Sequence, residues 1–376
     1  CFSVRSCAAS LYAQGAQRFS QAFQIVRAVI FKGQLTAVFA LLNADLTAEN
    51  AFQLLLQRRD IIHGKVAFLR LWLRRLFIHA LGERLRLTDG HAGHLLCGFD
   101  ALILLRDGEH RARMAAGELS PASHPRTRPP YLEAEAVSRL LRIAQAADAP
   151  VVIVHLTNRE ALLEVDHARK RGQKVYVETC PQYLLLDESV YFNEDYSAAA
   201  RYVCAPPLRD KAEQEHLWKG LRRGAIQTVS TDHCSFTLAQ KDMGREDFTK
   251  IPGGLPGVET RGELLYSYGV AKRKISAAQM CRVLSENPAR LYGLYPRKGV
   301  LRPGSDADIV VYDPGASHVI RAEDCVANVD YNPYEGFVTA GGIRQVWLRG
   351  QLSVENGKVL VEAPAGKYMA RGKNSL

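Results

Sequence analysis

Two short apolar runs in this sequence each end in a side chain that can bind a metal ion. Residues 151–155 read Val-Val-Ile-Val-His, and residues 227–232 read Gln-Thr-Val-Ser-Thr-Asp. Runs rich in β-branched residues, separated by helical patterns, predict parallel strands that are buried on both faces. In a barrel of such strands the chemistry sits at the carboxyl ends, where His155 and Asp232 fall. The alternative is a hydrogen-bonded core histidine and an aspartate that caps a loop.

An imidazole and a carboxylate at these two strand ends could hold metal ions that hydrolyse an amide. Hydrolysis of an unactivated amide at neutral pH requires a nucleophile stronger than water and a sink for the charge that develops on oxygen, and two metal ions supply both. A carboxylate that ligates a metal through one oxygen can also pass a proton to the leaving nitrogen. His155 fits the role of ligand, and Asp232 fits the roles of ligand and proton carrier. Separated by 77 positions, the two residues alone would be weak evidence.

Strand and helix patterns alternate around these residues. Apolar residues at helical spacing predict a helix from Tyr131 to Asp148, and Asn158 can cap a second helix, over 159–171, that Gly172 ends. The other predicted elements are strands over 150–156, 174–179 and 226–231 and a charged helix near 209–223. This order predicts an α/β fold with a parallel sheet inside a layer of helices. About three strands of an eight-stranded barrel can be recognised.

After residue 298 the pattern changes to short strands and turns. Residues 299–314 predict a turn, a strand and a second turn. Residues 346–350 and 358–361, with the Asn356–Gly357 turn between them, predict a hairpin. The last residues, 366–376, are expected to form a loose tail.

The composition limits the class of protein. A chain of 376 residues can hold one barrel of about 250 residues and a small second domain. No run of about 18 apolar residues predicts a membrane span. Eight cysteines without a CxxC pair are typical of a reduced, cytoplasmic protein. The arginines are scattered and match no known reader motif, so we expect no nucleic-acid partner.

The first 128 residues do not match the rest of the chain. They hold 17 lysines and arginines against 9 acidic residues, and no proline occurs before Pro121. Three interpretations are open. The segment could be an organelle transit peptide, because no acidic residue precedes Asp45. It could also be a real helical extension, or a sequence translated in the wrong frame or from a fragment. We favour the third, because the recognisable pattern begins abruptly near Arg128.

From about residue 128 to the C-terminus the chain resembles the dihydropyrimidinase and hydantoinase branch of the cyclic amidohydrolases. Nine blocks in the order of that family carry the resemblance. They are 128–136, 154–157, 178–186, 205–209, 230–234, 251–259, 286–290, 304–308 and 330–336. The resemblance implies a TIM-like β/α barrel, of which 129–298 would be the C-terminal part, and a small β-sandwich domain over 299–365.

The resemblance also implies an activity and site residues. The activity would be the metal-dependent opening of a dihydropyrimidine or hydantoin ring, a small cyclic amide, to an N-carbamoyl amino acid. His155 would bind the second metal ion, and Asp232 would bind the first and act as general base. Ala205 stands where the family usually has a substrate-contacting serine, and Gly253 where it often has a substrate-contacting asparagine. Two zinc ions and a homotetramer, with no membrane partner, complete the expectation.

Part of the expected metal site is not visible in the sequence. The family has a His-x-His pair, a bridging carbamylated lysine and a further histidine, none of which we recognise in residues 1–128. His91 and His94 share a face on a helix but not on a strand, so we do not assign them as ligands. His233 points away from Asp232 on an extended strand end, and we expect it to be structural. Alternatives to an enzyme are a catalytically inactive assembly protein, as the collapsin-response mediators are, or a damaged product that does not fold.

Overall fold

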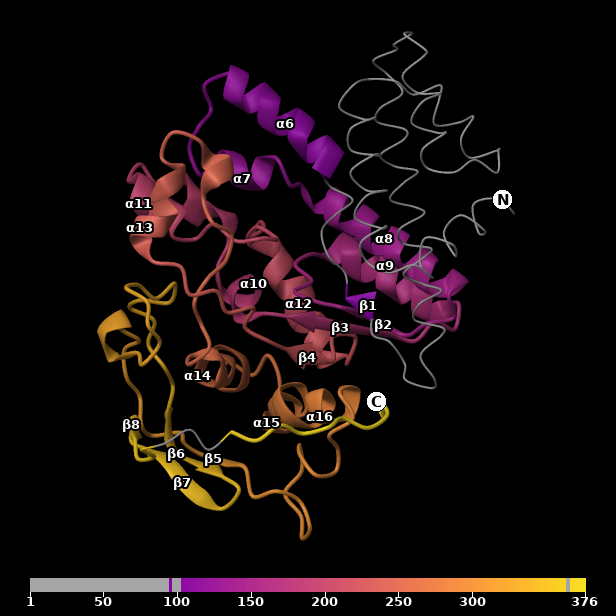
Figure 1. Cartoon of the computed structure of the whole chain (residues 1–376), viewed down its shortest axis with the longest axis vertical. Helices are drawn as coiled ribbons and strands as arrows, with labels where there is room; N and C mark the ends of the chain where they lie inside the picture. Colours follow the sequence, from indigo (N-terminus) through magenta and orange to yellow (C-terminus); the bar gives the residue numbers. More distant parts are fainter. Residues whose placement is uncertain (1–94, 97–102, 363–365) are drawn as a thin grey trace, which may run out of the picture. The chain divides into compact units, whose positions relative to one another are not determined.

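The structure is a computed structural model that describes residues 95–96, 103–362 and 366–376 (Figure 1). The chain divides into two units, Cys1–Asp89 and Gly90–Leu376, and all described residues belong to the second. This unit contains a four-stranded parallel sheet and a four-stranded antiparallel sheet. The expected α/β class is confirmed. His91 and His94 lie outside the described residues.

The parallel sheet has the strand order β1-β2-β3-β4. Its strands are β1 (Leu95–Leu96), β2 (Val151–Ile153), β3 (Val175–Thr179) and β4 (Thr228–Val229). Strand β2 is buried throughout, with no residue more than 2% exposed, as expected for a parallel strand covered on both faces. It ends two residues before His155, so the predicted ligand follows the strand rather than belonging to it.

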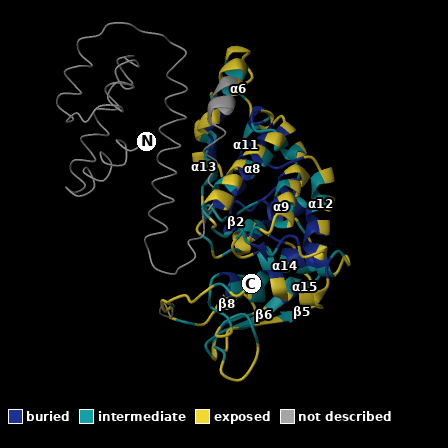
Figure 2. Cartoon of the chain, turned by 90° about the vertical axis from the view of Figure 1, so that its right-hand side faces the viewer, coloured by how far each residue is buried: buried dark blue, intermediate teal, exposed yellow. Residues whose placement is uncertain are grey.

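Helices α8 (Pro130–Ala146) and α9 (Arg159–Lys170) pack together beside β2 and β3. The Asn158 side chain accepts a hydrogen bond from the Ala161 backbone N–H at 2.9 Å, so the predicted N-cap is confirmed. Gly172 follows the helix with a φ of +85°, a conformation that glycine adopts without strain. Figure 2 shows buried and exposed residues on the same helices, as expected of helices that cover a sheet.

Helix α12 (Ala212–Arg222) brings the largest buried side chain to this core. Trp218 is fully buried, and its indole N–H donates to the Leu184 carbonyl at 3.2 Å. A β-carbon at Gly220 would lie only 2.9 Å from the side chain of Ile226, so this glycine allows the helix to approach the chain that leads into β4. These contacts fix where β4, and therefore Asp232, lies.

The remaining described helices are α6 (Ile103–Ala115), which has 13 residues, and a set of helices of five residues or fewer. The short helices are α7 (Ser123–Arg126), α10 (Pro181–Leu185), η2 (Glu188–Phe192), α11 (Tyr196–Ala200), α13 (Leu238–Lys241), η3 (Asp242–Gly244), η4 (Phe248–Lys250), α14 (Arg261–Leu265), η5 (Tyr266–Val270), α15 (Ala277–Cys281), η6 (Arg282–Glu286), α16 (Asn287–Leu291) and η7 (Ala322–Asp324). None of the helices in the described part is both long and apolar enough to cross a membrane.

The antiparallel sheet has the order β5-β6-β7-β8. Its strands are β5 (Ile309–Asp313), β6 (Gly342–Leu348), β7 (Gln351–Glu355) and β8 (Lys358–Val359). Asn356 and Gly357 both have positive φ and form the predicted turn. Arg349 and Gly350 form a second turn of this kind, which the sequence did not reveal because arginine rarely adopts positive φ.

This sheet is attached to the helix formed by α14 and η5. The Glu263 carboxylate accepts a hydrogen bond from the Ile343 backbone N–H at 3.1 Å. The rings of Tyr266 and Tyr312 lie 4.4 Å apart. The C-terminal tail, expected to be loose, also hydrogen-bonds to its own chain: Gly372 N–H donates to the Gly293 carbonyl at 2.8 Å.

Residues 95–96 and 103–127 were grouped with the unmatched segment, yet they belong to the folded unit. Leu95 and Leu96 pair in parallel with Val151 and Val152. Ser123, His124 and Thr127 are buried. The sequence did not show this because β1 has two residues and α7 has four, which is too short for a measurable periodicity.

Candidate active site

His155 lies directly beyond β2 and is partly buried. Its φ is +42°, a left-handed conformation that is unfavourable for a residue with a β-carbon. Burial lowers the pKa of its imidazole, although the nearby charges of Asp232 and Glu133 oppose that shift. The ring is therefore mostly neutral at pH 7, the protonation state in which an imidazole can bind a metal ion.

Asp232 occupies the equivalent place beyond β4, with a φ of +49°. The Gln182 side chain holds the preceding residue by donating to the Thr231 carbonyl at 3.2 Å. The Asp232 charge acts on the imidazole of His155 and on the carboxyl of Glu178, so the three side chains are electrostatic neighbours. The structure thus brings the two predicted residues to the same end of the sheet, and strained backbone at both is typical of functional sites.

Glu178 is a third polar residue at this end of the sheet, and the sequence did not single it out. Burial and the Asp232 charge raise the pKa of its carboxyl to about 7, against the opposing effect of Arg261. The backbone N–H of His155 also opposes this rise in pKa. The available signal was its position near the end of β3, at the carboxyl edge that the other two residues share.

The chemistry of these donors fits a divalent cation only in part. A neutral imidazole and a carboxylate are ordinary ligands of zinc. Among the residues that the structure describes, however, no group of three or more histidine, cysteine, aspartate or glutamate side chains could hold a metal ion. A complete coordination sphere would therefore need ligands from outside the described residues.

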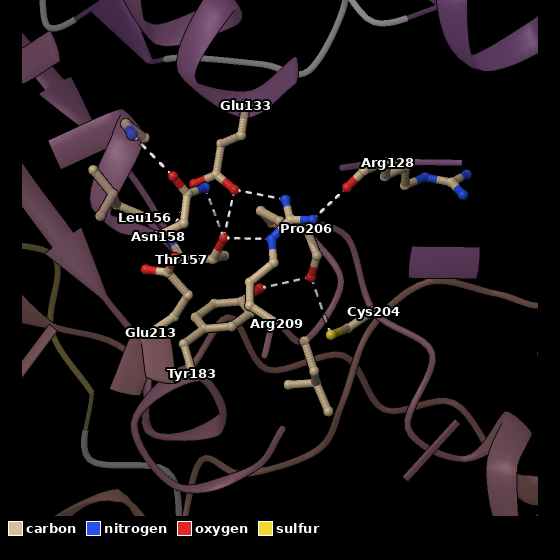
Figure 3. Close-up of polar contacts among 12 residues, drawn as sticks. Arg128, Glu133, Leu156, Thr157, Asn158, Tyr183, Cys204, Pro206, Arg209 and Glu213 are labelled. Carbon is tan, nitrogen blue, oxygen red and sulfur yellow. Dashed lines mark hydrogen bonds and ion pairs between the residues drawn. The ribbon is translucent and has the colours of Figure 1, made fainter. Parts of the chain in front are cut away.

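The loop that follows His155 is held by a buried ion pair. The Arg209 guanidinium donates to a Glu133 carboxylate oxygen at 2.8 Å, and each side chain is only 5% exposed. The same carboxylate accepts hydrogen bonds from the backbone N–H and the hydroxyl of Thr157, at 2.9 and 2.5 Å. Arg209 also donates to the Thr157 hydroxyl at 2.9 Å and to the Arg128 carbonyl. Figure 3 shows the side chains of Glu133, Thr157 and Arg209 pointing toward one another.

Ala205 and Gly253, the predicted substrate-binding residues, lie against each other. A β-carbon at Gly253 would be 3.5 Å from the β-carbon of Ala205. Both residues are exposed, whereas Cys204, Pro206 and Gly254 beside them are buried. Tyr183 and Cys204 both donate to the Pro206 carbonyl, each at 3.1 Å, and so hold the Ala205 loop from its buried side (Figure 3).

His124 supports the same loop and was missed by the sequence analysis. Its Nε2 lies 2.7 Å from the Cys204 carbonyl and its Nδ1 lies 3.1 Å from the Arg128 guanidinium. Because the guanidinium can only donate, Nδ1 accepts and the Nε2–H donates to the carbonyl. Burial and the charge of Arg128 hold the pKa of this imidazole well below its usual range. No sequence signal identifies it, because its partner is a main-chain carbonyl 80 residues away.

His233 contacts the main chain of the segment around Leu255 and Gly257. Its Nδ1 accepts hydrogen bonds from the backbone N–H groups of Gly257 and Val258, at 3.1 and 3.3 Å. His233 also forms a parallel bridge with Leu255. The expectation that this residue is structural agrees with these contacts.

Comparison with known proteins identifies relatives of this region. Residues 107–353 match the amidohydrolase family. This match begins before residue 128, where the resemblance became visible in the sequence. A D-phenylhydantoinase of Escherichia coli O127:H6 (strain E2348/69 / EPEC) is 44% identical over 260 residues, which are 69% of this chain and 56% of that protein. The chain therefore spans little more than half the length of this relative.

Solved structures of similar proteins have the same fold. A dihydropyrimidinase from Brevibacillus agri NCHU1002 is 42% identical, with a TM-score of 0.71 over 72% of this chain and 59% of that one. A D-hydantoinase from Bacillus sp. AR9 is 41% identical, with a TM-score of 0.70 and the same coverage. An L-hydantoinase from Arthrobacter aurescens is 30% identical, with a TM-score of 0.64 over 69% and 56%. The expected β/α-barrel architecture is thereby confirmed for the matched region.

Proposed function

Because the chain belongs to the amidohydrolase family, we propose that it takes part in the metal-dependent hydrolysis of a cyclic amide. The ring would be a hydantoin or a dihydropyrimidine, and the product an N-carbamoyl amino acid. The names of the relatives support this substrate class. The observation that carries the proposal is the placement of His155 and Asp232, both in a strained left-handed conformation, at the same edge of the parallel sheet.

His155 and Asp232 are the proposed metal ligands. Divalent cations, which we take to be a pair of zinc ions, would supply a Lewis acid and an activated water at neutral pH. Asp232 is also the proposed general base, because its carboxylate can carry a proton to the leaving ring nitrogen. Burial keeps the imidazole of His155 neutral and so able to coordinate. The other ligands would come from residues outside those that the structure describes.

Ala205 and Gly253 are the proposed substrate contacts, through their main chain. Neither side chain offers a polar group, but the two residues are adjacent and exposed. Among the described residues, the backbone N–H of neither one has a hydrogen-bond acceptor. Two unused N–H donors side by side suit a ring carbonyl oxygen. The small size of both residues leaves room for a ring substituent.

The domain division at residues 128, 298 and 365, the homotetramer and the cytoplasmic location stay predictions. The domain division and the homotetramer rest on the family resemblance, and the cytoplasmic location rests on the pattern of cysteines.

Ring opening can be measured directly. The full chain, purified after growth with zinc, is expected to release N-carbamoyl amino acids from hydantoin or dihydrouracil. His155→Ala and Asp232→Asn should each lower kcat at least about a hundredfold, since general acid–base catalysis contributes about 10²–10⁴-fold. His167→Ala and Asp324→Asn, at exposed positions, are matched controls that should retain full activity.

Two results would contradict the proposal. A folded, zinc-loaded wild-type chain that opens neither ring would favour the catalytically inactive assembly protein instead. Equal activity of the His155→Ala variant and the wild type would remove that residue from the site.

A further inference from the structure

Lys241 is a fully buried cation whose three hydrogen bonds all go to main-chain carbonyls. Its Nζ donates to the carbonyls of Val203, Pro252 and Gly254, at 2.7, 2.6 and 2.7 Å. A protonated amine has three N–H donors, so these bonds use all of them. Among the described residues it forms no ion pair with a carboxylate. A cation without a carboxylate partner is costly to bury, which calls for a reason beyond packing.

The three carbonyls belong to the two segments that carry the proposed substrate contacts. Val203 lies two residues before Ala205, and Pro252 and Gly254 flank Gly253. Gly254 N–H also donates to the Val203 carbonyl at 3.0 Å, so the two segments are hydrogen-bonded to each other as well as to the lysine. Gly254 cannot be replaced here, because its φ is +151° and a β-carbon would lie 2.5 Å from that of Cys234.

The local sequence places Lys241 at this junction. Thr237 and Gln240 form a capping box at the start of α13: the Thr237 hydroxyl accepts from the Gln240 N–H at 3.3 Å, and the Gln240 side chain accepts from the Thr237 N–H at 2.9 Å. Asp330 further accepts a hydrogen bond from the Leu238 N–H at 2.9 Å. The helix therefore presents its last residue to the junction in a fixed orientation.

We propose that Lys241 is a positioning residue that orients the main-chain N–H of Gly253, beside that of Ala205, toward a ring carbonyl of the substrate. In the described residues the only cis peptides are Ala205–Pro206 and Tyr295–Pro296, so the peptide bond between Pro252 and Gly253 is trans. In a planar trans peptide the C=O and N–H point in opposite directions. Because the Pro252 carbonyl points inward to Lys241, the Gly253 N–H points outward.

His124 does the same for the neighbouring donor. Its Nε2–H binds the Cys204 carbonyl, so the Ala205 N–H of that trans peptide also points away from the interior. A charge-assisted hydrogen bond to a carbonyl also polarises the peptide and strengthens its N–H as a donor. Lys241 and His124 thus hold the carbonyls of two neighbouring peptides, so that the N–H groups of Gly253 and Ala205 keep a fixed direction. This inference rests on the proposed function, because it assumes that a cyclic amide binds there.

The test uses the full-length, zinc-loaded chain labelled with [¹⁵N]glycine. The Gly253 amide signal is identified by its loss in Gly253→Ala. In Lys241→Met the Gly253 signal should move, because the Pro252 carbonyl of the same peptide loses its donor. The Gly254 signal should also move, because the Val203 carbonyl that accepts the Gly254 N–H loses its bond to the lysine. Lys250→Met is the matched control, since that side chain is 69% exposed and lies in the same segment. A folded Lys241→Met variant with unmoved Gly253 and Gly254 signals would overturn the proposal.

Ligand binding separates positioning from a merely structural role. Dihydrouracil, added after the zinc has been removed with a chelator so that the ring is not opened, should shift the wild-type Gly253 signal in a saturable way. Lys241→Met should raise the Kd at least about tenfold, in line with losing charged hydrogen bonds, while the zinc content before chelation stays the same. An unchanged Kd would overturn the proposal. The two proposals can fail separately. If dihydrouracil does not shift the wild-type Gly253 signal, the proposed function fails. If Lys241→Met still moves that signal, the inference that Lys241 orients the Gly253 peptide is upheld.

A pH titration of the wild type needs no variant, so it tests the role of Lys241 even if Lys241→Met does not fold. Burial lowers the pKa of Lys241 to about 8, opposed by the facing thiols of Cys204 and Cys234. Burial raises the pKa of both thiols, that of Cys204 to about 11, and lowers that of His124 well below its usual range. The Gly253 signal should therefore titrate with a midpoint near pH 8. A Gly253 signal that stays fixed while the Lys241 amine, followed by its own side-chain signal, loses its proton would overturn the proposal.

Discussion

The two sheets of the described unit differ in how completely they are covered. In β2 of the parallel sheet no residue is more than 2% exposed, whereas in β5 of the antiparallel sheet Val310 is 58% and Val311 is 41% exposed. The parallel strands are held from both faces, and the loops beyond them are fixed by buried polar contacts. Val310 and Val311 are consecutive and so point to opposite faces, which means that β5 is open on both. A site whose side chains must be placed accurately needs strands that are held on both faces, which explains why the candidate residues lie at the end of the parallel sheet.

The largest predicted effect on stability concerns the buried Glu133–Arg209 ion pair, which holds the loop after His155. Arg209→Met leaves the Glu133 carboxylate buried without its partner, so the free energy of unfolding should fall by about 3–5 kcal/mol. Arg222→Met removes an exposed pair with Glu215 and should cost less than about 1 kcal/mol. Urea denaturation of both variants measures the two values. Equal losses would contradict the distinction between buried and exposed pairs.

A smaller effect is expected in the strand core. Ile153→Val removes one methylene from a side chain that is 2% exposed, and the loss should be about 0.5–1.5 kcal/mol because the cavity is small. The same denaturation experiment measures it. A loss below the error of the measurement would show that β2 is less tightly packed than its burial indicates.

The smallest effect is expected in the antiparallel sheet. Val310→Thr keeps the β-branched shape at an exposed position, so stability should change by no more than about 0.5 kcal/mol. A loss comparable to that of Ile153→Val would mean that Val310 is covered in solution, and the contrast between the two sheets would then fail.

Much of the parallel sheet could be predicted from sequence because local signals were strong. The Asn158 cap, the Gly172 terminus and the apolar strands act within a few residues, and the structure has them where the sequence placed them. His155 and Asp232 could be placed at strand ends for the same reason. Their strained backbone could not be foreseen, because it depends on the surrounding structure.

The supports of the site could not be predicted. His124 and Lys241 bind main-chain carbonyls, which every residue has, so no pattern of side chains reveals the partners. The Glu133–Arg209 pair joins residues 76 positions apart, and nothing local distinguishes it from a pair of exposed charges. Contacts of this kind become visible only when the chain is folded.

The most direct test of the proposed site is the zinc content of the full chain, measured by plasma mass spectrometry and normalised to protein. We expect about two zinc ions per chain in the wild type and in His167→Ala, by analogy with two-metal hydrolases. His155→Ala and Asp232→Asn should each lose most of this zinc while remaining folded. A wild-type value near zero, or a zinc content that neither substitution changes, would contradict the assignment of His155 and Asp232 as metal ligands.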